Sequence, residues 1–135
     1  MSGRDPVRRF LAERGVPAGM VAAGLPGLIA EWERTVAQIE TGYPLGLDDY
    51  LNDLDGRQLL AEAVALAAAD ERPPATERIG RADARARAHL RAVGECLWGA
   101  RVAEYEGWTP EVNWWYFAVP RSPGPLLRED LGARS

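Results

Sequence analysis

The sequence contains no lysine, one cysteine and one histidine, and these shortages exclude several classes of chemistry. A chain without lysine has no Schiff-base nucleophile, no lysine general base and no phosphate-binding loop of the GxxxxGK[ST] type. The single cysteine, Cys96, excludes an internal disulfide. Cys96 and His89 together supply too few ligands for a structural zinc site made of cysteine and histidine.

Nucleophilic hydrolases are also disfavoured. The only serines, Ser2, Ser122 and Ser135, lie close to the two ends of the chain, away from the single histidine, His89. Cys96 follows His89 by seven residues, which in a helix separates the two by about two turns. That is too far for direct proton transfer from the thiol to the imidazole. We therefore interpret Cys96 as a buried thiol and His89 as a structural histidine.

The charge balance bears on the kind of partner. Sixteen basic residues, all arginine, stand against twenty acidic ones, so the formal net charge is −4. Sequence-independent affinity for nucleic acid comes mainly from neutralised phosphates, so general nucleic-acid binding is disfavoured. A protein partner or a homo-oligomer suits this chain better. The sequence predicts neither a cofactor nor a bound metal ion.

Composition and the N-terminal region bear on location. Arginine without lysine, with abundant alanine and glycine, is typical of a GC-rich bacterial genome, and one unpaired cysteine fits the reducing cytosol. No stretch is long and apolar enough to cross a membrane as a helix. Arg8 and Arg9 precede an uncharged run at 15–30, a pattern superficially like a twin-arginine export signal, but Pro17 and Pro26 interrupt the run. We therefore predict a bacterial cytoplasmic protein.

Length and hydrophobic periodicity predict one all-α domain, a helical bundle of four to six helices. A chain of 135 residues builds one core without needing disulfides or metals. Asp5 followed by Pro6 is a helix start, and Gly15 is expected to end this first short helix. Another turn of helix is expected at 17–23. The clearest helix follows it, with six apolar residues on one stripe: Leu25, Leu28, Ile29, Trp32, Val36 and Ile39.

Two helices are predicted after the turn at 42–46. Leu47 or Asp48 opens a short helix whose apolar residues face one way. Asp55 and the glutamine three residues later match a capping box, so a second helix is expected to start there and to run to about Ala69.

The longest helix is predicted over 75–104. Pro73 and Pro74 are expected to stop the preceding helix, and Gly107 to end this one. Gly94 weakens the middle of the segment by about 1 kcal/mol relative to alanine, so a bend is expected near it. Its apolar stripe consists of Ile79, Ala82, Ala86, Leu90, Val93, Leu97 and Ala100.

The C-terminal region differs in composition, being rich in aromatic residues and proline. Five of the eleven aromatic residues lie within ten positions, from Trp108 to Phe117. High strand propensity over 113–119 and three prolines after it predict a short extended segment. The predicted domain therefore has a core at about 5–119 and an extended proline-rich tail at 120–135. A last turn of helix is expected around Leu126, Leu127 and Leu131.

The aromatic cluster is the strongest candidate for a functional surface. In an extended chain Trp114 and Tyr116 point to one side, and Trp115 and Phe117 to the other, so both faces are apolar. One interpretation is that the helices bury one face and the tail covers the second. The other is an exposed patch that docks a partner or stacks on a ring-shaped ligand. The predicted partner-binding aromatics are Trp108, Trp114, Trp115 and Tyr116.

Acidic residues at the start of the middle helices are a second candidate surface, formed by Asp48, Asp49 and Asp53. We interpret them as favouring the positive N-terminal ends of two successive helices. A metal site is the alternative. The spacing of an EF-hand loop is matched at four positions, but its first ligand would be Leu51, which cannot coordinate a cation.

Arginines crowd the predicted long helix. Arg78, Arg81 and Arg85 share a face that could contact phosphates or an acidic partner. The spacings Glu77 to Arg81 and Asp83 to Arg87 predict i, i+4 ion pairs that would partly neutralise it. A third interpretation pairs Arg78, Arg81 and Arg85 with the acids at 48–55.

Two hypotheses of function follow, besides the binding of RNA or DNA by the arginine-rich helix. The first is a non-enzymatic interaction protein, such as an adaptor, an antitoxin or an immunity protein, that uses the acidic and aromatic residues named above. The second is a small-ligand-binding or carboxylate- and metal-dependent enzyme, with a pocket among the helices lined by Trp98, His89 and carboxylates.

Overall fold

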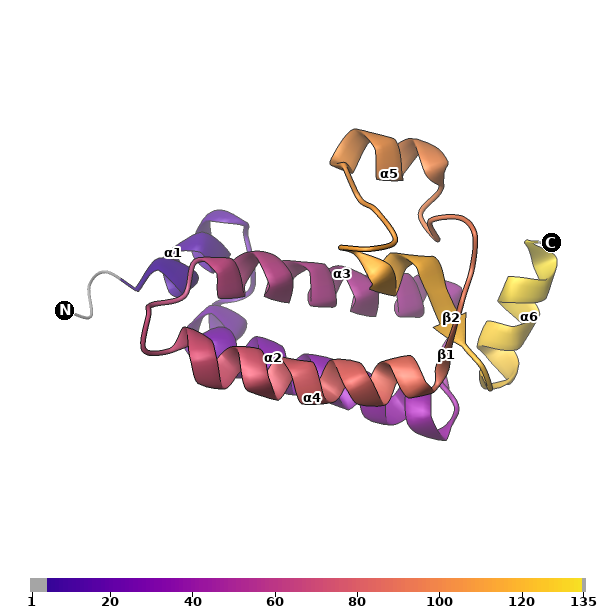
Figure 1. The fold of residues 1–135 in the computed structure, drawn as a ribbon, viewed down its shortest axis with the longest axis horizontal. Coiled ribbons are helices and arrows are strands. Elements are labelled where there is room, and N and C mark those ends of the chain that lie inside the picture. The colour runs from indigo at the N-terminus through magenta and orange to yellow at the C-terminus, as the bar shows by residue number, and fades with distance from the viewer. Residues whose placement is uncertain (1–4, 135) are drawn as a thin grey trace.

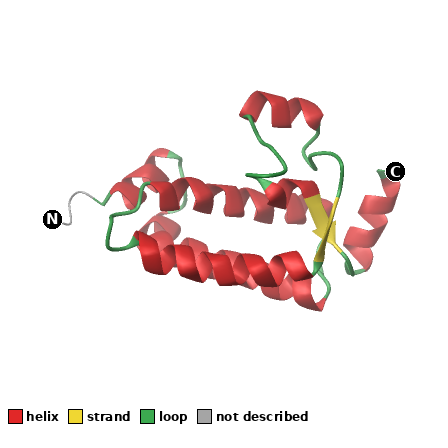
Figure 2. Ribbon diagram, in the orientation of Figure 1, coloured by secondary structure: helices red, strands yellow, loops and turns green. Residues whose placement is uncertain are grey.

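The computed structural model describes residues 5–134 and folds them into a small, mainly helical bundle (Figure 1, Figure 2). This confirms the predicted all-α class, at the upper end of four to six helices, with one two-stranded sheet added among the described residues. None of these helices is long and apolar enough to span a membrane. In chain order the elements are α1 (Pro6–Glu13), α2 (Ala18–Thr41), α3 (Leu47–Ala65), α4 (Arg72–Ala88), β1 (Leu90–Ala92), α5 (Ala100–Glu106), the 3-10 helix η2 (Trp114–Phe117), β2 (Ala118–Pro120) and α6 (Pro125–Ala133).

The first two helices begin as expected. The side chain of Asp5 caps α1 by accepting the backbone N–H of Arg8 at 3.1 Å. Gly15 follows α1 with a φ of 76°, a left-handed conformation that glycine adopts without strain. The predicted turn at 17–23 belongs to α2, which kinks at Gly24, where φ is 64°. The six-residue apolar stripe after the kink is buried, as predicted.

The middle of the chain forms one helix where two were predicted. α3 runs without a break through Asp55 and Gln58, so these residues do not cap a second helix. Its last helical residue is Ala65, and the expected end near Ala69 is therefore too late. Asp48 does lie in the first turn, as predicted. The capping-box pattern misleads because both of its side chains bond to a distant part of the chain.

The prediction of one long helix over 75–104 is wrong. α4 begins at Arg72, so Pro73 and Pro74 lie in its first turn, where a missing N–H costs nothing. It ends at Ala88, and the chain enters β1, which pairs antiparallel with β2, Leu90 opposite Pro120. Pairing with a strand almost thirty residues later overrides the helical propensity of 89–99. The chain returns to helix only in α5, which Gly107 ends, as expected.

The extended C-terminal segment is shorter than predicted. Trp114–Phe117 is a 3-10 helix, and only Ala118–Pro120 is a strand. The predicted extended tail at 120–135 contains a helix of nine residues, α6, in which Leu127 is fully buried. Asp130 of α6 also accepts the backbone N–H of Leu47 at 2.9 Å, and so caps α3 from a distant element.

Three helices form the body of the molecule. α2, α3 and α4 lie side by side along its long axis, and their facing sides make the core (Figure 1). α1 packs at one end, while the sheet and α6 lie at the other. α5 stands away from the bundle on the side of α3, and the two chain segments leading to and from it rise from the region of η2 and the sheet (Figure 1).

Candidate functional site

The aromatic residues of η2 belong mainly to the core. Trp115 and Tyr116 expose only 3% and 1% of their surface. A 3-10 helix turns successive side chains by about 120°, so the predicted alternation between two faces is wrong. The ring of Trp108 stacks on Tyr116, with centroids 3.9 Å apart. Of the four predicted partner-binding aromatics, Trp108 and Trp114 are the two that keep partly exposed surface.

Hydrogen bonds attach η2 to α3. The hydroxyl of Tyr116 donates to Asp55 Oδ1 at 2.6 Å, and the indole N–H of Trp98 donates to the same oxygen at 3.0 Å. Asn113 Nδ2 donates to Gln58 Oε1 at 2.9 Å. Burial raises the pKa of Tyr116, and the bond to Asp55 raises it further, so the hydroxyl keeps its proton. Asp55 and Gln58 therefore hold the aromatic residues in place.

A buried ion pair joins α3 and α4 beneath the aromatics. Arg57 donates to both carboxylate oxygens of Asp83, at 2.8 and 3.1 Å, and Trp32 Nε1 donates to the same carboxylate at 2.9 Å. The guanidinium of Arg57 lies 4.1 Å from the ring centroid of Trp115. Sequence reasoning missed this pair. The available signal was the position of Arg57, three residues after the buried Leu54 and on the same helical face.

Only two of the three residues of the predicted acidic surface are exposed. Asp48 and Asp49 are exposed in the first turn of α3. Asp53 lies inside that helix, where the hydroxyl of Tyr43 donates to its carboxylate at 2.6 Å. Burial raises the pKa of Asp53, and this hydrogen bond opposes the rise. Within residues 5–134 no group of three histidine, cysteine or acidic side chains is placed to hold a metal ion, so the metal-dependent alternative lacks a donor set there.

The predicted arginine face is neutralised by glutamates. Two of its members bridge α4 to α2, and the third forms the expected i, i+4 pair within α4. Pairing with the acids at 48–55 is therefore wrong. In the bridging pairs the arginine hydrogen bonds lower the pKa of each glutamate. The pairs are Arg78 with Glu33 at 2.7 Å, Arg85 with Glu40 at 2.5 Å, and Arg81 with Glu77 at 2.9 Å.

The remaining predicted reactive groups lie apart. Since α4 ends at Ala88, His89 and Cys96 do not share a helix. Cys96 is buried, and burial raises the pKa of its thiol, which disfavours the nucleophilic thiolate. His89 Nδ1 lies 3.1 Å from the carbonyl of Arg85. Trp98 bonds to α3, so no hydrogen bond among the described residues joins it to His89 in the predicted ligand pocket.

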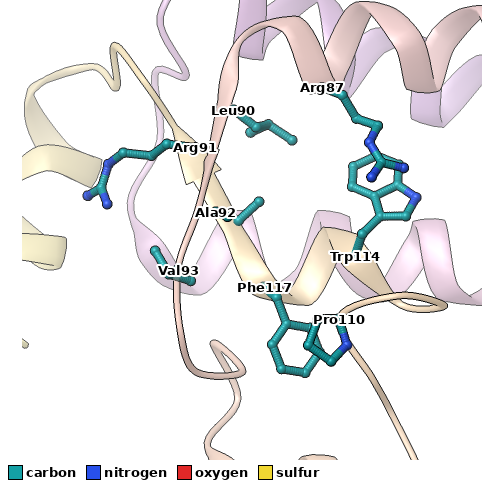
Figure 3. A pocket seen from close by; sticks show the side chains of 9 residues that line it. Arg87, Leu90, Arg91, Ala92, Val93, Pro110, Trp114 and Phe117 are labelled. Atoms are coloured by element: carbon teal, nitrogen blue, oxygen red, sulfur yellow. The ribbon is translucent and has the colours of Figure 1, made fainter.

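One surface cavity lies between the sheet, η2 and the end of α4 (Figure 3). Its volume is about 190 Å³. Most of its lining is apolar. Arg87 also lines it, and the guanidinium carbon of this residue lies over the ring of Trp114, 4.6 Å from the ring centroid. The predicted pair of Arg87 with Asp83 does not form, because Asp83 binds Arg57. The apolar lining consists of Leu90, Ala92, Val93, Pro110, Trp114, Phe117 and Ala118.

Next to this cavity, residues 98–112 carry α5 away from the bundle; we call them the projecting segment. Tyr105 exposes 85% of its surface and Val112 69%, and Trp98 and Val102 are also exposed. These are four of the seven large apolar side chains that are exposed in the described part of the chain. Ala103 is the buried residue of α5. Sequence reasoning assigned the first seven residues of this segment to the long helix and so missed its exposure.

The cavity and the projecting segment together offer apolar surface next to two arginines, Arg87 and Arg91. A surface of this kind can bind a ligand or a partner. Comparison with protein-family models, with curated proteins and with solved structures finds no match for this chain.

Proposed function

We propose that this protein is a non-enzymatic interaction module of the bacterial cytosol, of the adaptor, antitoxin or immunity type, and that it binds a protein partner through the projecting segment. The observation that carries the proposal is the clustering of exposed apolar side chains there. Isolated apolar residues are common on protein surfaces, but four of the seven exposed large ones lie on this one short segment, and such a concentration favours a binding surface.

The shape of the segment supports this use. Val102 and Tyr105 are three residues apart in α5 and so share one helical face. Ala103 turns toward the rest of the protein, and the tyrosine is left in solvent. Tyrosine is among the residues that most often dominate binding energy at interfaces, because it buries a large rigid ring and still offers a hydroxyl.

The cytosolic location and the bacterial origin are supported by sequence composition and by Cys96, a buried free thiol that suits a reducing compartment. The predicted acidic surface of Asp48, Asp49 and Asp53 forms no part of the proposed binding surface. Asp48 and Asp49 are exposed at the start of α3, and a second contact with a partner through them stays a separate prediction.

Photo-crosslinking from position 105 tests the proposal in the cell that encodes the protein. Benzoylphenylalanine replaces Tyr105 in one variant and Leu66 in the control. Leu66 is also an exposed large apolar residue, but it follows α3 at the α1 end of the bundle (Figure 1). We expect a light-dependent covalent product with another protein from position 105 and none from position 66.

The crosslinked partner then allows a quantitative check. Tyr105→Arg is expected to weaken its affinity about 30-fold, which corresponds to the roughly 2 kcal/mol of an interface hot spot. Crosslinks from both positions, or from neither, would contradict the proposal. A product of two copies of this chain would replace the partner by a homo-oligomer.

A further inference from the structure

The cavity beside Arg87 combines an apolar lining with two arginines, Arg87 and Arg91, of which Arg87 lies over the ring of Trp114. Figure 3 shows Trp114 with the Arg87 guanidinium over its ring on one side, and Phe117 and Pro110 together on another. Pro110 belongs to the projecting segment, so that segment supplies part of the cavity wall. At about 190 Å³ it exceeds the roughly 150 Å³ of an apolar cavity that admits a benzene ring. One leucine- or phenylalanine-sized side chain therefore fits.

Arg87 differs from the other arginines of α4. Three of those bind glutamates, and Arg72 donates to two backbone carbonyls, those of Ala65 and Ala67. Among residues 5–134, Arg87 makes no ion pair and no side-chain hydrogen bond. Its contact with Trp114 fixes the guanidinium next to the cavity and leaves its five N–H donors for an acceptor from outside.

The charge around the cavity has the sign opposite to that of the whole chain. The net charge is −4, yet both charged residues of the lining, Arg87 and Arg91, are cations, and neither forms an ion pair within residues 5–134. Arg121 after β2 is also exposed. The backbone N–H of Arg121 donates to the carbonyl of His89 at 2.8 Å, so these residues lie together at the sheet. An acidic partner is complementary to this local positive charge.

The aromatic rings favour a peptide over a nucleic acid. Stacking of bases requires an open ring face, but Arg87 covers Trp114, and the ring also meets Trp32 and Trp115 edge to face, with centroids 6.5 and 5.5 Å away. Phe117 is buried. A side chain can enter the cavity between these groups without displacing them, whereas a base would have to displace the guanidinium.

We propose that this cavity receives an acidic segment of a partner protein, which inserts one apolar side chain and pairs a neighbouring carboxylate with the guanidinium of Arg87. This inference rests on the proposed function and names the chemistry of its partner. Arginine suits the role because its planar fork bonds both oxygens of a carboxylate at once.

Selection from a random peptide library displayed on phage tests the inference without the natural partner. The purified full chain is the bait, and the strongest binders are resynthesised with a fluorescent label, each with a counterpart in which glutamine or asparagine replaces the acidic residue. We expect selected peptides that carry Asp or Glu beside Leu, Ile or Phe. Arg87→Gln and the neutral counterpart peptides are each expected to lower affinity at least tenfold.

Two variants provide the matched controls. Arg91→Gln removes the same charge from the other arginine of the lining, whose side chain extends away from Trp114 in Figure 3, and is expected to change affinity less than threefold. Arg9→Gln, in α1 at the other end of the bundle, is expected to change nothing. Ala92→Leu fills the cavity from an exposed strand position and is expected to weaken binding at least tenfold. Thermal unfolding of each variant shows that the fold is kept.

Three results would overturn the inference: selected peptides without acidic enrichment, equal effects of Arg87→Gln and Arg91→Gln, or displacement of the peptide by single-stranded oligothymidylate, which would assign the cavity to nucleic acid. The crosslink from position 105 is independent of these readouts. A crosslink with no peptide selectivity therefore refutes the inference alone, and peptide selectivity with no crosslink refutes the proposed function.

Discussion

Removing Asp83 is expected to be among the most damaging single changes to this fold. Its carboxylate accepts two hydrogen bonds from Arg57 and one from Trp32, so Asp83→Ala leaves three donors from two side chains without an acceptor. The Arg57 side chain is only 8% exposed, so its guanidinium would be left largely buried without its counter-charge. Breaking one partner of a buried ion pair costs about 3–5 kcal/mol, and we expect about 3 kcal/mol here because Asp83 lies closer to solvent.

Arg57→Met should cost less, since Asp83 then keeps its bond to Trp32 and is 18% exposed. The double variant should lose at least 1 kcal/mol less than the sum of the two single losses, because the second change no longer strands a charge. Urea unfolding followed by circular dichroism measures all three. With a slope of about 1–3 kcal/mol per molar urea, the Asp83→Ala midpoint falls by about 1–3 M.

The control for these variants is Arg81→Met, which breaks the exposed pair of Arg81 with Glu77 and should cost less than about 0.5 kcal/mol. The reasoning fails if Asp83→Ala costs no more than this control. It also fails if the losses of the two single variants add up to the loss of the double variant, because two residues in a coupled buried pair have an interaction free energy that makes their losses non-additive.

Two further predictions concern surface contacts. Arg78 holds the pKa of Glu33 below its usual value, so this pair stabilises the fold above the pKa of an unfolded glutamate, about 4.3, and loses its effect as the pH falls through the lower folded value. The difference in unfolding free energy between wild type and Glu33→Gln should therefore shrink from pH 7 to about pH 3. A difference that stays constant over this range would contradict the pairing. Asp130→Ala removes the cap that α6 gives to the N-terminus of α3 and should cost about 1 kcal/mol in urea unfolding. The neighbouring Glu129→Ala is the control and should cost almost nothing. Equal losses in the two variants would show that the cap contributes nothing.

The parts of the fold that sequence reasoning recovered are those decided within a few residues. The start of α1 depends on Asp5 and Pro6, which are adjacent, and the apolar stripe of α2 repeats within one helix. Such patterns report local conformation and the face that will be buried. The all-α class follows from them with little dependence on how the helices are arranged.

The parts that sequence reasoning missed depend on distant partners. Residues 89–99 contain only two glycines as helix breakers, and the backbone leaves the helix to pair with a distant segment, where Val93 N–H donates to Phe117 and Arg121 N–H donates to His89. The four aromatics of η2 have high strand propensity, yet packing against α3 makes them helical. Tertiary contacts of this kind leave no periodic trace in the sequence.

The candidate site shows the same division. Composition indicated binding over catalysis, and the aromatic cluster led to Trp114. Exposure of the projecting segment could not be foreseen, because it follows from the early end of α4. Arg57 could have been noticed as a cation on an apolar helical face, which is a signal that a partner must be buried with it.

The pairing at the base of the projecting segment has a consequence for how such a protein can diverge. Leu97 donates its backbone N–H to the carbonyl of Tyr116 at 2.8 Å, so the chain leaves the bundle and returns to it at one point. Each doubling of the length of a closed loop costs only about 0.6 kcal/mol. The bundle therefore tolerates a longer, shorter or different chain in place of α5, as long as Trp98, Trp108 and the buried residues from Asn113 onward keep their contacts, and new binding specificities can be grafted there while the scaffold stays the same.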